Sequence, residues 1–473
     1  MKPKNRILYP FLLTLLVVAG LAALQALPPL TVEGYTLRPV SLLSDVIPAQ
    51  EDTFQLPEPV DSVLLAKADT TDNTAMERIR VLMADSLGEA LIEDYSFLMP
   101  DTVLGNRHGM AHFYEALAQS RSMNRPVRIA YFGDSFIEGD LMTADLRAKL
   151  QSAYGGSGVG FVDIDSPIAG FRVSVKSHSV NWHSHSATDT GGFKAAKQGI
   201  AERYFIPAGN SSVRLQGGAH SLHQDSCRES ALFCRVDEPV TVTARINRGE
   251  PETFYLDASP DVQRVMVSGS IGQVEWSVPD SIDGQFFGAT MDAGQGIILD
   301  NFALRGSSGT TLNAIPNSTL RDFAALREYD LIVFQFGLNV ASNGVKDYSS
   351  YQEKMARVIR KFARAYPEAS LLVVGMSDRG ERKDGVVVTM PCVKYLNHYQ
   401  RQLAMTTGCC YWNLFQAMGG DGSMGRMVEE DRPAKANMDY THINAHGGRF
   451  VAGLLFDAIQ KGKQMYEEGG VIE

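Results

Sequence analysis

The sequence predicts an α/β protein in which a parallel sheet, covered by helices on both faces, is interrupted by an all-β insertion and preceded by an apolar helix. Three observations predict this class. Apolar strands alternate with helical patterns in two separate stretches of the chain, as is typical of a parallel sheet. Short alternating segments, divided by Gly, Pro, Asn and Asp, lie between those stretches. The N-terminus carries one long apolar run.

The apolar run over residues 7–27 follows three basic residues and is long enough to span a bilayer as a helix. The basic flank would stay in the cytoplasm. A cleaved signal peptide is the alternative, although residues 24–26 (Leu-Gln-Ala) put a large side chain where cleavage needs a small one. We expect residues 1–30 to be a signal anchor or a signal peptide. The protein would then work in the cell envelope, anchored to the inner membrane and facing the periplasm, or be secreted if the signal is cleaved.

Residues 31–105 are rich in Pro, Asp, Thr and Ser and have only short apolar patches, a composition typical of a linker. Residues 74–92 are the exception, because apolar side chains recur there at helical spacing. We expect a linker with one short amphipathic helix, which carries the rest of the chain away from the membrane.

The α/β domain is expected over residues 106–172 and 300–473. In its first part, a strand over residues 127–132 leads through a sharp turn into a helix over residues 141–154. Its second part alternates further strands and helices, which we place at residues 331–336, 351–366, 370–376, 393–406 and 445–461. Alternation of this length predicts a parallel sheet with helices on both faces.

Residues 173–299 have the pattern of an all-β domain and resemble a β-sandwich inserted into a loop of the α/β domain. Several aromatic side chains in this insertion either stack on sugar rings or fill the core, and burial is the commoner fate of large aromatics. They are Trp182, Tyr204, Phe205, Tyr255, Trp276, Phe286 and Phe287.

Charge and cysteine usage argue against several kinds of partner. The chain of 473 residues has a net charge of −10, which gives no general attraction to nucleic acid. The five cysteines form no paired CxxC arrangement, and His178, His183 and His185 have no acidic or cysteine partner at a fixed spacing. We predict neither a metal nor another cofactor. Cys227 and Cys234 either pair across neighbouring strands in an oxidising compartment or stay free and buried.

Ser135 is the first candidate for chemistry, because it lies at the sharp turn between the strand over residues 127–132 and the following helix. A hydroxyl at such a turn is exposed at the carboxyl edge of the sheet, near the positive end of the helix dipole, where an oxyanion is stabilised. Gly133 lets the chain turn without a clashing β-carbon. Gly-Asp-Ser is also typical of a helix N-cap, so the tripeptide alone does not define an enzyme.

The segment Gly133-Asp134-Ser135 resembles the first of four blocks of the SGNH (GDSL-type) hydrolase family, and three more blocks follow in that family's order. The second is residues 305–311, a glycine block, and the third is residues 334–339, a Gly-x-Asn block after an apolar strand. The fourth is Asp439-Tyr440-Thr441-His442, an Asp-x-x-His block before the last helix. The resemblance implies the three-layer, flavodoxin-like α/β fold of that family.

The resemblance also implies roles for individual residues. Ser135 would be the nucleophile, His442 the base that removes its proton, and Asp439 the carboxylate that orients the imidazole. The backbone N–H groups of Ser135 and Gly309 and the side-chain amide of Asn339 would form the oxyanion hole.

Two alternative assignments stay open. Gly306 is the rival of Gly309 as an oxyanion donor within the glycine block. His446, four residues after His442, is the alternative base if the fourth block is aligned differently, since a base must reach the serine in space.

A narrower resemblance is to the SGNH branch that contains bacterial peptidoglycan O-acetylesterases with an inserted carbohydrate-binding module. It rests on segments within residues 139–160, on residues 411–424 and on the place of the insertion. Phe136 departs from this branch, which often has His there. The resemblance therefore supports the reaction more strongly than the substrate.

These resemblances imply a serine esterase that removes O-acetyl or other short acyl groups from an envelope or extracellular polysaccharide such as peptidoglycan, through an acyl-serine intermediate. Two alternatives stay open. The same residues would serve a polysaccharide O-acetyltransferase that works beside an acyl-exporting membrane partner. A chain with a decayed site would be a non-catalytic glycan-binding protein.

Overall fold

The computed structural model describes residues 31–32, 35–36, 91–98, 109–189, 191–219 and 222–468. The predicted membrane segment, residues 1–30, lies outside these ranges, as does almost all of the predicted short helix at 74–92. None of the helices that the structure describes is both long and apolar enough to cross a membrane.

The chain divides into two units, residues 1–57 and residues 58–473. In the first unit, β1 (Thr31–Val32) pairs antiparallel with β2 (Tyr35–Thr36). All the elements described below belong to the second unit.

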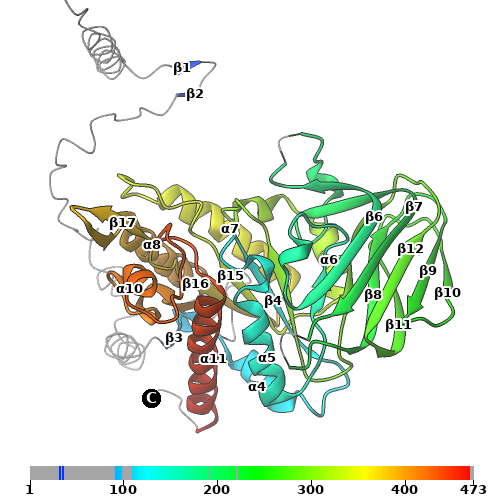
Figure 1. Ribbon diagram of the computed structural model, residues 1–473, viewed down its shortest axis with the longest axis horizontal. Helices are drawn as coiled ribbons and strands as arrows, with labels where there is room; N and C mark the ends of the chain where they lie inside the picture. The colour runs from blue at the N-terminus through cyan, green and yellow to red at the C-terminus, as the bar shows by residue number, and fades with distance from the viewer. Residues whose placement is uncertain are drawn as a thin grey trace, which may run out of the picture. The chain divides into compact units, whose positions relative to one another are not determined.

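A six-stranded sheet with the order β14-β4-β15-β16-β19-β3 organises the second unit (Figure 1). The first five strands run parallel, and β3 pairs antiparallel with β19. The strands are β3 (Ile92–Asp94), β4 (Val127–Gly133), β14 (Ile297–Ala303), β15 (Leu331–Gln335), β16 (Ser370–Val374) and β19 (Cys410–Trp412).

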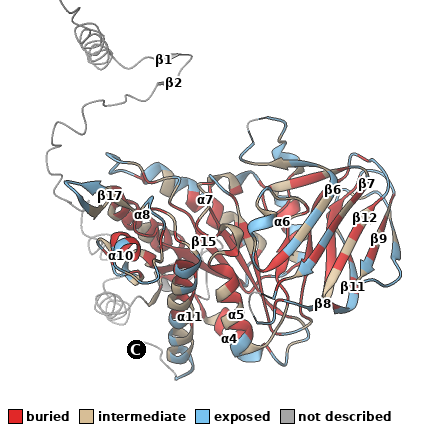
Figure 2. Cartoon of the chain, in the orientation of Figure 1, coloured by how far each residue is buried: buried red, intermediate tan, exposed pale blue. Residues whose placement is uncertain are grey.

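Helices cover both faces of this sheet. Successive side chains of a strand point to opposite faces, so neighbouring residues of β4 contact different sets of helices. Tyr131 of β4 belongs to an apolar cluster with residues of α4, α5 and α11, whereas Phe132 belongs to another with residues of α6, α7 and α8. Figure 2 shows the buried strands between these helices. The helices are α4 (Ala111–Gln119), α5 (Thr143–Tyr154), α6 (Asn317–Leu326), α7 (Ser349–Ala365), α8 (Pro391–Thr407) and α11 (Ala445–Glu467), with two short ones, α9 (Leu414–Ala417) and α10 (Ser423–Glu429), before α11.

The predicted parallel α/β architecture is therefore confirmed. Three strands of the sheet were not predicted: β3, β14 and β19. β3 lies in the stretch that we expected to be linker, and β14 begins at Ile297, within the expected insertion.

The stretch between β5 and β13 is all-β, as predicted, and forms one nine-stranded antiparallel sheet. Its strands from β7 to β13 share one apolar core, which includes Leu215, Leu232 and Trp276. The strands are β5 (Gly160–Val162), β6 (Val175–Ser186), β7 (Arg203–Gly217), β8 (Cys227–Arg235), β9 (Val240–Ile246), β10 (Glu252–Leu256), β11 (Gln263–Ile271), β12 (Gln273–Val278) and β13 (Gln285–Met291).

Most of the aromatic side chains that we considered for sugar binding are buried instead, Phe205, Trp276 and Phe286 in this core and Tyr204 and Phe287 in the cluster that contains Phe132. Tyr204, Phe205, Trp276, Phe286 and Phe287 are each no more than 1% exposed. Tyr255 on β10 differs, with 82% exposure. A general sugar-stacking role for this set is therefore excluded by burial.

A buried ion network fastens the insertion to the α/β sheet. Arg327 donates hydrogen bonds to both carboxylate oxygens of Asp292, just after β13, and of Asp300 in β14. All three side chains are almost fully buried. A buried charge is costly unless it is paired, so separating these three side chains would be unfavourable. The triad therefore holds the end of β13 next to β14.

The disulfide that we considered between Cys227 and Cys234 is absent, since both thiols are free and buried. Both residues belong to one strand, β8, and lie at its two ends rather than on neighbouring strands. A strand rises about 3.3 Å per residue, so seven residues separate these side chains by far more than a disulfide can span.

Candidate active site

Ser135 lies at the carboxyl edge of the parallel sheet, two residues after the end of β4. The chain does not enter a helix directly after it. The 3₁₀ turn η2 (Glu138–Asp140) follows, and α5 begins only at Thr143. Ser135 therefore lies eight residues before α5, and the contribution that we expected from the α5 dipole at the serine is small because that effect fades within one turn.

The structure brings Ser135, His442 and Asp439 into one hydrogen-bonded line. The Ser135 Oγ lies 3.2 Å from His442 Nε2, and His442 Nδ1 lies 2.7 Å from Asp439 Oδ2. A neutral imidazole that donates from Nδ1 to the carboxylate leaves Nε2 as the acceptor for the serine hydroxyl. This is the geometry required for a base to remove the serine proton.

A tight turn over residues 437–442 presents Asp439 and His442. The Asp439 Oδ1 accepts hydrogen bonds from the backbone N–H groups of Thr441 and His442, each at 3.0 Å. Partial burial alone would raise the pKa of the Asp439 carboxyl, but these bonds and the His442 ring lower it below its ordinary value. The carboxylate therefore stays ionised and able to orient the ring in mildly acidic solution.

The two other predicted oxyanion donors, Gly309 and Asn339, meet at Ser307. The Gly309 N–H donates to Ser307 Oγ and the Asn339 side-chain amide donates to the Ser307 carbonyl oxygen, both at 3.0 Å. An Asn amide carries two N–H groups, so this bond leaves one for an oxyanion. The single N–H of Gly309 would have to exchange Ser307 for the substrate oxygen. The oxyanion roles of Ser135, Gly309 and Asn339 stay predictions.

Gly306 and Gly309 both have positive φ angles, of 80° and 82°. They differ in the space around them. A β-carbon at Gly309 would lie 2.6 Å from the Phe336 ring, whereas one at Gly306 would meet nothing within 4 Å. Gly309 is therefore the position where only glycine fits, which favours it as the residue that brings its backbone close to a reacting group.

The segment between β4 and α5, residues 134–142, is called the serine loop here because it carries Ser135. Asp134 connects this loop to the loop after β15. Its carboxylate accepts hydrogen bonds from the N–H of Phe136 at 3.0 Å and from that of Gly337 at 3.3 Å. Burial raises the pKa of Asp134 to about 6 in spite of these bonds. The side chain thus fixes the start of the serine loop against the segment that carries Asn339.

A buried network around Asp140 holds the other end of the serine loop. The Asp140 carboxylate accepts hydrogen bonds from Arg147 at 3.3 Å, Arg172 at 3.0 Å and Asn301 at 2.7 Å. Ser174 and Thr143 bond the same carboxylate. Burial alone would raise the pKa of Asp140, but the two guanidinium groups and these hydrogen bonds lower it far below its ordinary value. Asp140 therefore stays ionised and locks η2 in place.

The insertion reaches the glycine block through Glu202, which precedes β7 and is only 3% exposed. Burial raises the pKa of Glu202 to about 7, although a hydrogen bond with Thr311 and the charge of Arg203 lower it. One oxygen of this carboxyl group has no hydrogen-bond partner among the residues that the structure describes. The side chain is thus a buried acid that touches the segment carrying Gly309.

A β-hairpin that the sequence did not predict supports the turn of His442. It consists of β17 (Gly380–Lys383) and β18 (Val386–Thr389). The Gly380 N–H donates to the Tyr440 carbonyl oxygen at 2.8 Å, and Arg382 donates to the Tyr440 hydroxyl at 2.6 Å. On its other side, Glu381 accepts a hydrogen bond from Asn343. The hairpin therefore connects the turn of His442 with the loop that follows Asn339.

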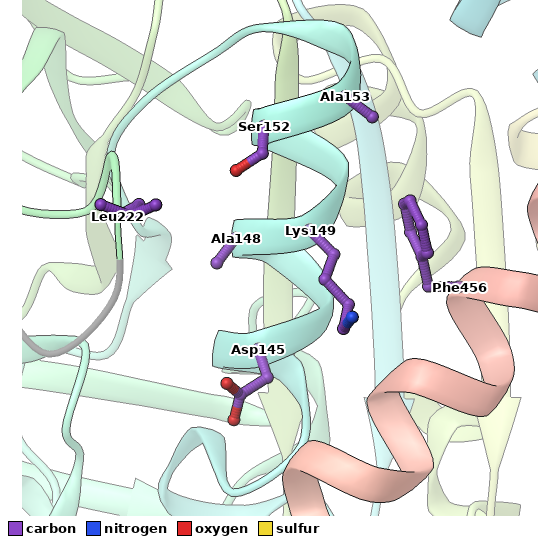
Figure 3. A pocket seen from close by; sticks show the side chains of 7 residues that line it. All are labelled: Asp145, Ala148, Lys149, Ser152, Ala153, Leu222 and Phe456. Atoms are coloured by element: carbon purple, nitrogen blue, oxygen red, sulfur yellow. The ribbon is translucent and has the colours of Figure 1, made fainter.

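The remaining candidates lie apart from this line. His446 is exposed in the first turn of α11, and it is His442 that contacts Ser135. His178, His183 and His185 lie on β6, where His185 stacks on Tyr204. A surface hollow between α5, α11 and Leu222 (Figure 3) is lined by none of the predicted site residues.

Sequence reasoning missed three supports of the site: Ser307, Tyr440 and Asp140. All lie within segments that we singled out, but each also has a partner in another segment: Asn339 for Ser307, Arg382 for Tyr440 and Asn301 for Asp140. Tyr440 has a φ of 50°, a conformation rare for non-glycine residues, and only the structure reveals it. No sequence signal marks the partner of Tyr440, because the hairpin strand β17 is polar and largely charged.

Comparison with known proteins gives a likeness in fold. No family model matches the chain, and no curated protein matches it in sequence. A solved peptidoglycan O-acetylesterase is similar over 74% of this chain and 95% of its own, with 20% identity and a TM-score of 0.62.

Two other solved structures score much lower. An acetyl xylan esterase matches over 34% of this chain and 80% of its own, with 20% identity and a TM-score of 0.26. A family two carbohydrate esterase from Clostridium thermocellum matches over 60% and 99%, with 13% identity and a TM-score of 0.25. Scores this low carry no argument about the fold. The likeness to the O-acetylesterase, with its TM-score of 0.62, shows that this chain shares the fold of that protein.

Proposed function

We propose that this protein is a serine esterase that removes O-acetyl or other short acyl groups from an envelope or extracellular polysaccharide such as peptidoglycan. The observation that carries the proposal is the unbroken line from Ser135 Oγ through the His442 ring to Asp439. A hydroxyl, an imidazole and a carboxylate in this order make a nucleophile that can form a covalent acyl intermediate.

The proposed reaction has two steps. His442 Nε2 takes the proton of Ser135 as its Oγ attacks the ester carbonyl carbon, and the ester C–O bond breaks while the same proton passes to the sugar oxygen. Water then attacks the acyl-serine, with His442 again as the base, and releases the acid and the free serine. Asp439 keeps the ring in the required tautomer throughout.

The negative charge on the carbonyl oxygen needs donors that are already in place. The Ser135 N–H and the second N–H of the Asn339 amide fit this role, and Gly309 joins them once its N–H leaves Ser307. Each such donor is typically worth about 3 kcal/mol of transition-state stabilisation.

A carbohydrate ester as substrate is supported by two observations. A solved structure with the same fold is a peptidoglycan O-acetylesterase. The all-β insertion contacts the loop of the predicted oxyanion donor, because its Glu202 bonds Thr311, two residues after Gly309. An N-terminal anchor that holds the enzyme at the inner membrane, facing a periplasmic polysaccharide, completes the proposal.

The test is acetate release from O-acetylated peptidoglycan and from 4-nitrophenyl acetate by the full-length chain. Ser135→Ala should lower both rates by about 10³-fold or more, because the nucleophile is lost. Circular dichroism of the variant should match the wild type, since Ser135 is a small, partly exposed side chain.

An unchanged rate in Ser135→Ala would contradict the proposal. Acetyl groups that move to an added oligosaccharide instead of to water would assign the chain as a transferase with the same nucleophile. Binding of the glycan without hydrolysis of either ester would make it a glycan-binding protein.

A further inference from the structure

The loop between β5 and β6 lies against the serine loop. Its 3₁₀ turn η3 (Ala169–Phe171) ends beside η2. An ideal β-carbon built on Gly139 would lie 3.6 Å from the carbonyl oxygen of Phe171. Because Gly139 is four residues after Ser135, this contact places Phe171 next to the segment that carries the nucleophile.

Phe171 is 79% exposed, whereas Ala169 and Arg172, which lie before and after it in the sequence, line a polar cavity. An isolated exposed apolar residue needs no explanation on a protein surface. Phe171 differs from such an isolated residue because the residues that follow it are held in place by hydrogen bonds. Arg172 and Ser174 both bond the buried carboxylate of Asp140, which also holds η2. The chain next to Phe171 is thus held by the same buried carboxylate, that of Asp140, which holds the serine loop.

The cavity beside Phe171 has a volume of about 40 Å³ and is lined mainly by polar and charged side chains. This volume holds one or two small groups such as a hydroxyl or a water molecule, and it excludes a sugar ring. A sugar ring bound here would therefore lie outside the cavity, with only a substituent directed into it.

An ion pair completes the polar rim. Glu138, which lines the cavity, accepts a hydrogen bond at 2.8 Å from Arg305, the first residue of the glycine block. The Arg305 side chain is 70% exposed and Glu138 is 14% exposed. An exposed apolar ring on a loop that contacts η2, where this ion pair lies, offers both kinds of contact that a pyranose needs, since a pyranose has C–H faces and a rim of hydroxyls.

We propose that Phe171, with Glu138 and Arg305, forms a subsite for a pyranose ring of the polysaccharide that carries the ester. The inference rests on the proposed esterase function and names its substrate class more closely. Phe171 is a specificity-determining residue here, because it contacts the sugar and not the reacting carbonyl.

The test compares two substrates in one variant. Phe171→Ala should lower kcat/KM for O-acetylated peptidoglycan by about tenfold, chiefly through KM, since one stacking contact is lost. The same variant should hydrolyse 4-nitrophenyl acetate, which has no sugar, at the wild-type rate. Phe171→Trp should retain activity on the polysaccharide because it keeps an aromatic face.

Tyr255→Ala is the matched control. Tyr255 is 82% exposed on β10, the edge strand of the insertion, and its loss should change neither rate. An unchanged kcat/KM for the polysaccharide in Phe171→Ala, or an equal loss on both substrates, would overturn the subsite alone. A wild-type chain that hydrolyses neither ester would overturn the esterase function and the subsite with it.

Discussion

The two sides of the candidate active site are held in opposite ways. On the side of Ser135, buried charges fix the loop: Asp140 is 1% exposed and Arg147 is fully buried. On the other side, Asp439 and His442 are 49% and 41% exposed, and a surface hairpin supports their turn. The position of the nucleophile is therefore tied to the core, whereas the position of the base depends on contacts that water can replace.

This difference predicts how the two sides respond to mutation. Changes on the buried side should lower the stability of the whole domain, because unpaired buried charges are costly. Changes on the exposed side should alter catalysis while the fold persists, because surface ion pairs contribute little to stability.

The largest effect is expected for Asp140→Asn, which removes the negative charge between Arg147 and Arg172. Two buried guanidinium groups then lose their partner, so the free energy of unfolding should fall by about 3–5 kcal/mol. Urea denaturation followed by circular dichroism measures it. A loss below about 1 kcal/mol would mean that the network does not anchor the serine loop.

A smaller, pH-dependent effect is expected for Glu202→Gln. In the wild type, burial raises the pKa of Glu202 from 4.5 to about 7, so the folded protein binds this proton more tightly than the unfolded chain. Its stabilising contribution is complete below pH 4.5 and is lost as the pH rises through 7. Gln stays neutral and avoids this loss, which amounts to about 3 kcal/mol.

Thermal unfolding at pH 5 and at pH 8 measures this effect. The free energy of unfolding of Glu202→Gln minus that of the wild type should be larger at pH 8 than at pH 5. If the variant and the wild type differ in stability by the same amount at both pH values, Glu202 does not bind its proton more tightly in the folded protein than in the unfolded chain.

The smallest effect is expected for Arg382→Ala, on the exposed side. The change removes the hydrogen bonds to the Tyr440 hydroxyl and to Glu429 and leaves the backbone bond of Gly380 in place. We expect kcat for 4-nitrophenyl acetate to fall by about threefold to tenfold, because the turn of His442 samples more positions.

The melting temperature of Arg382→Ala should stay near that of the wild type. Lys383→Ala, next to it on β17, is the matched control and should leave kcat unchanged, because Lys383 pairs within the hairpin with Glu381. Equal kcat values in the wild type and Arg382→Ala would show that the hairpin does not position the base.

The fold could be predicted where single segments carried enough signal. β4, β15 and β16 are almost entirely apolar runs, so the sequence predicts them with nearly correct ends. β14 was missed because it contains Asp300 and Asn301, whose burial depends on partners from distant segments. β19 has only three residues, too few for a pattern.

The same distinction holds for the site. The resemblance carried by the four blocks implied that Ser135 and His442 would meet, and the structure brings them together. The bond between Asn339 and Ser307, the hairpin under Tyr440 and the ion network of Asp140 could not be predicted. Each depends on a side-chain contact that no local pattern encodes.

The central claim is that the Ser135 hydroxyl is activated by His442. Treatment of the full-length chain with a fluorophosphonate probe, followed by peptide mass mapping, tests it directly, because such a probe forms a P–Oγ bond with an activated serine as fluoride leaves. We predict a single adduct on Ser135 that is lost in His442→Ala. A folded wild-type chain that stays unmodified, or one modified at another serine, would contradict the account.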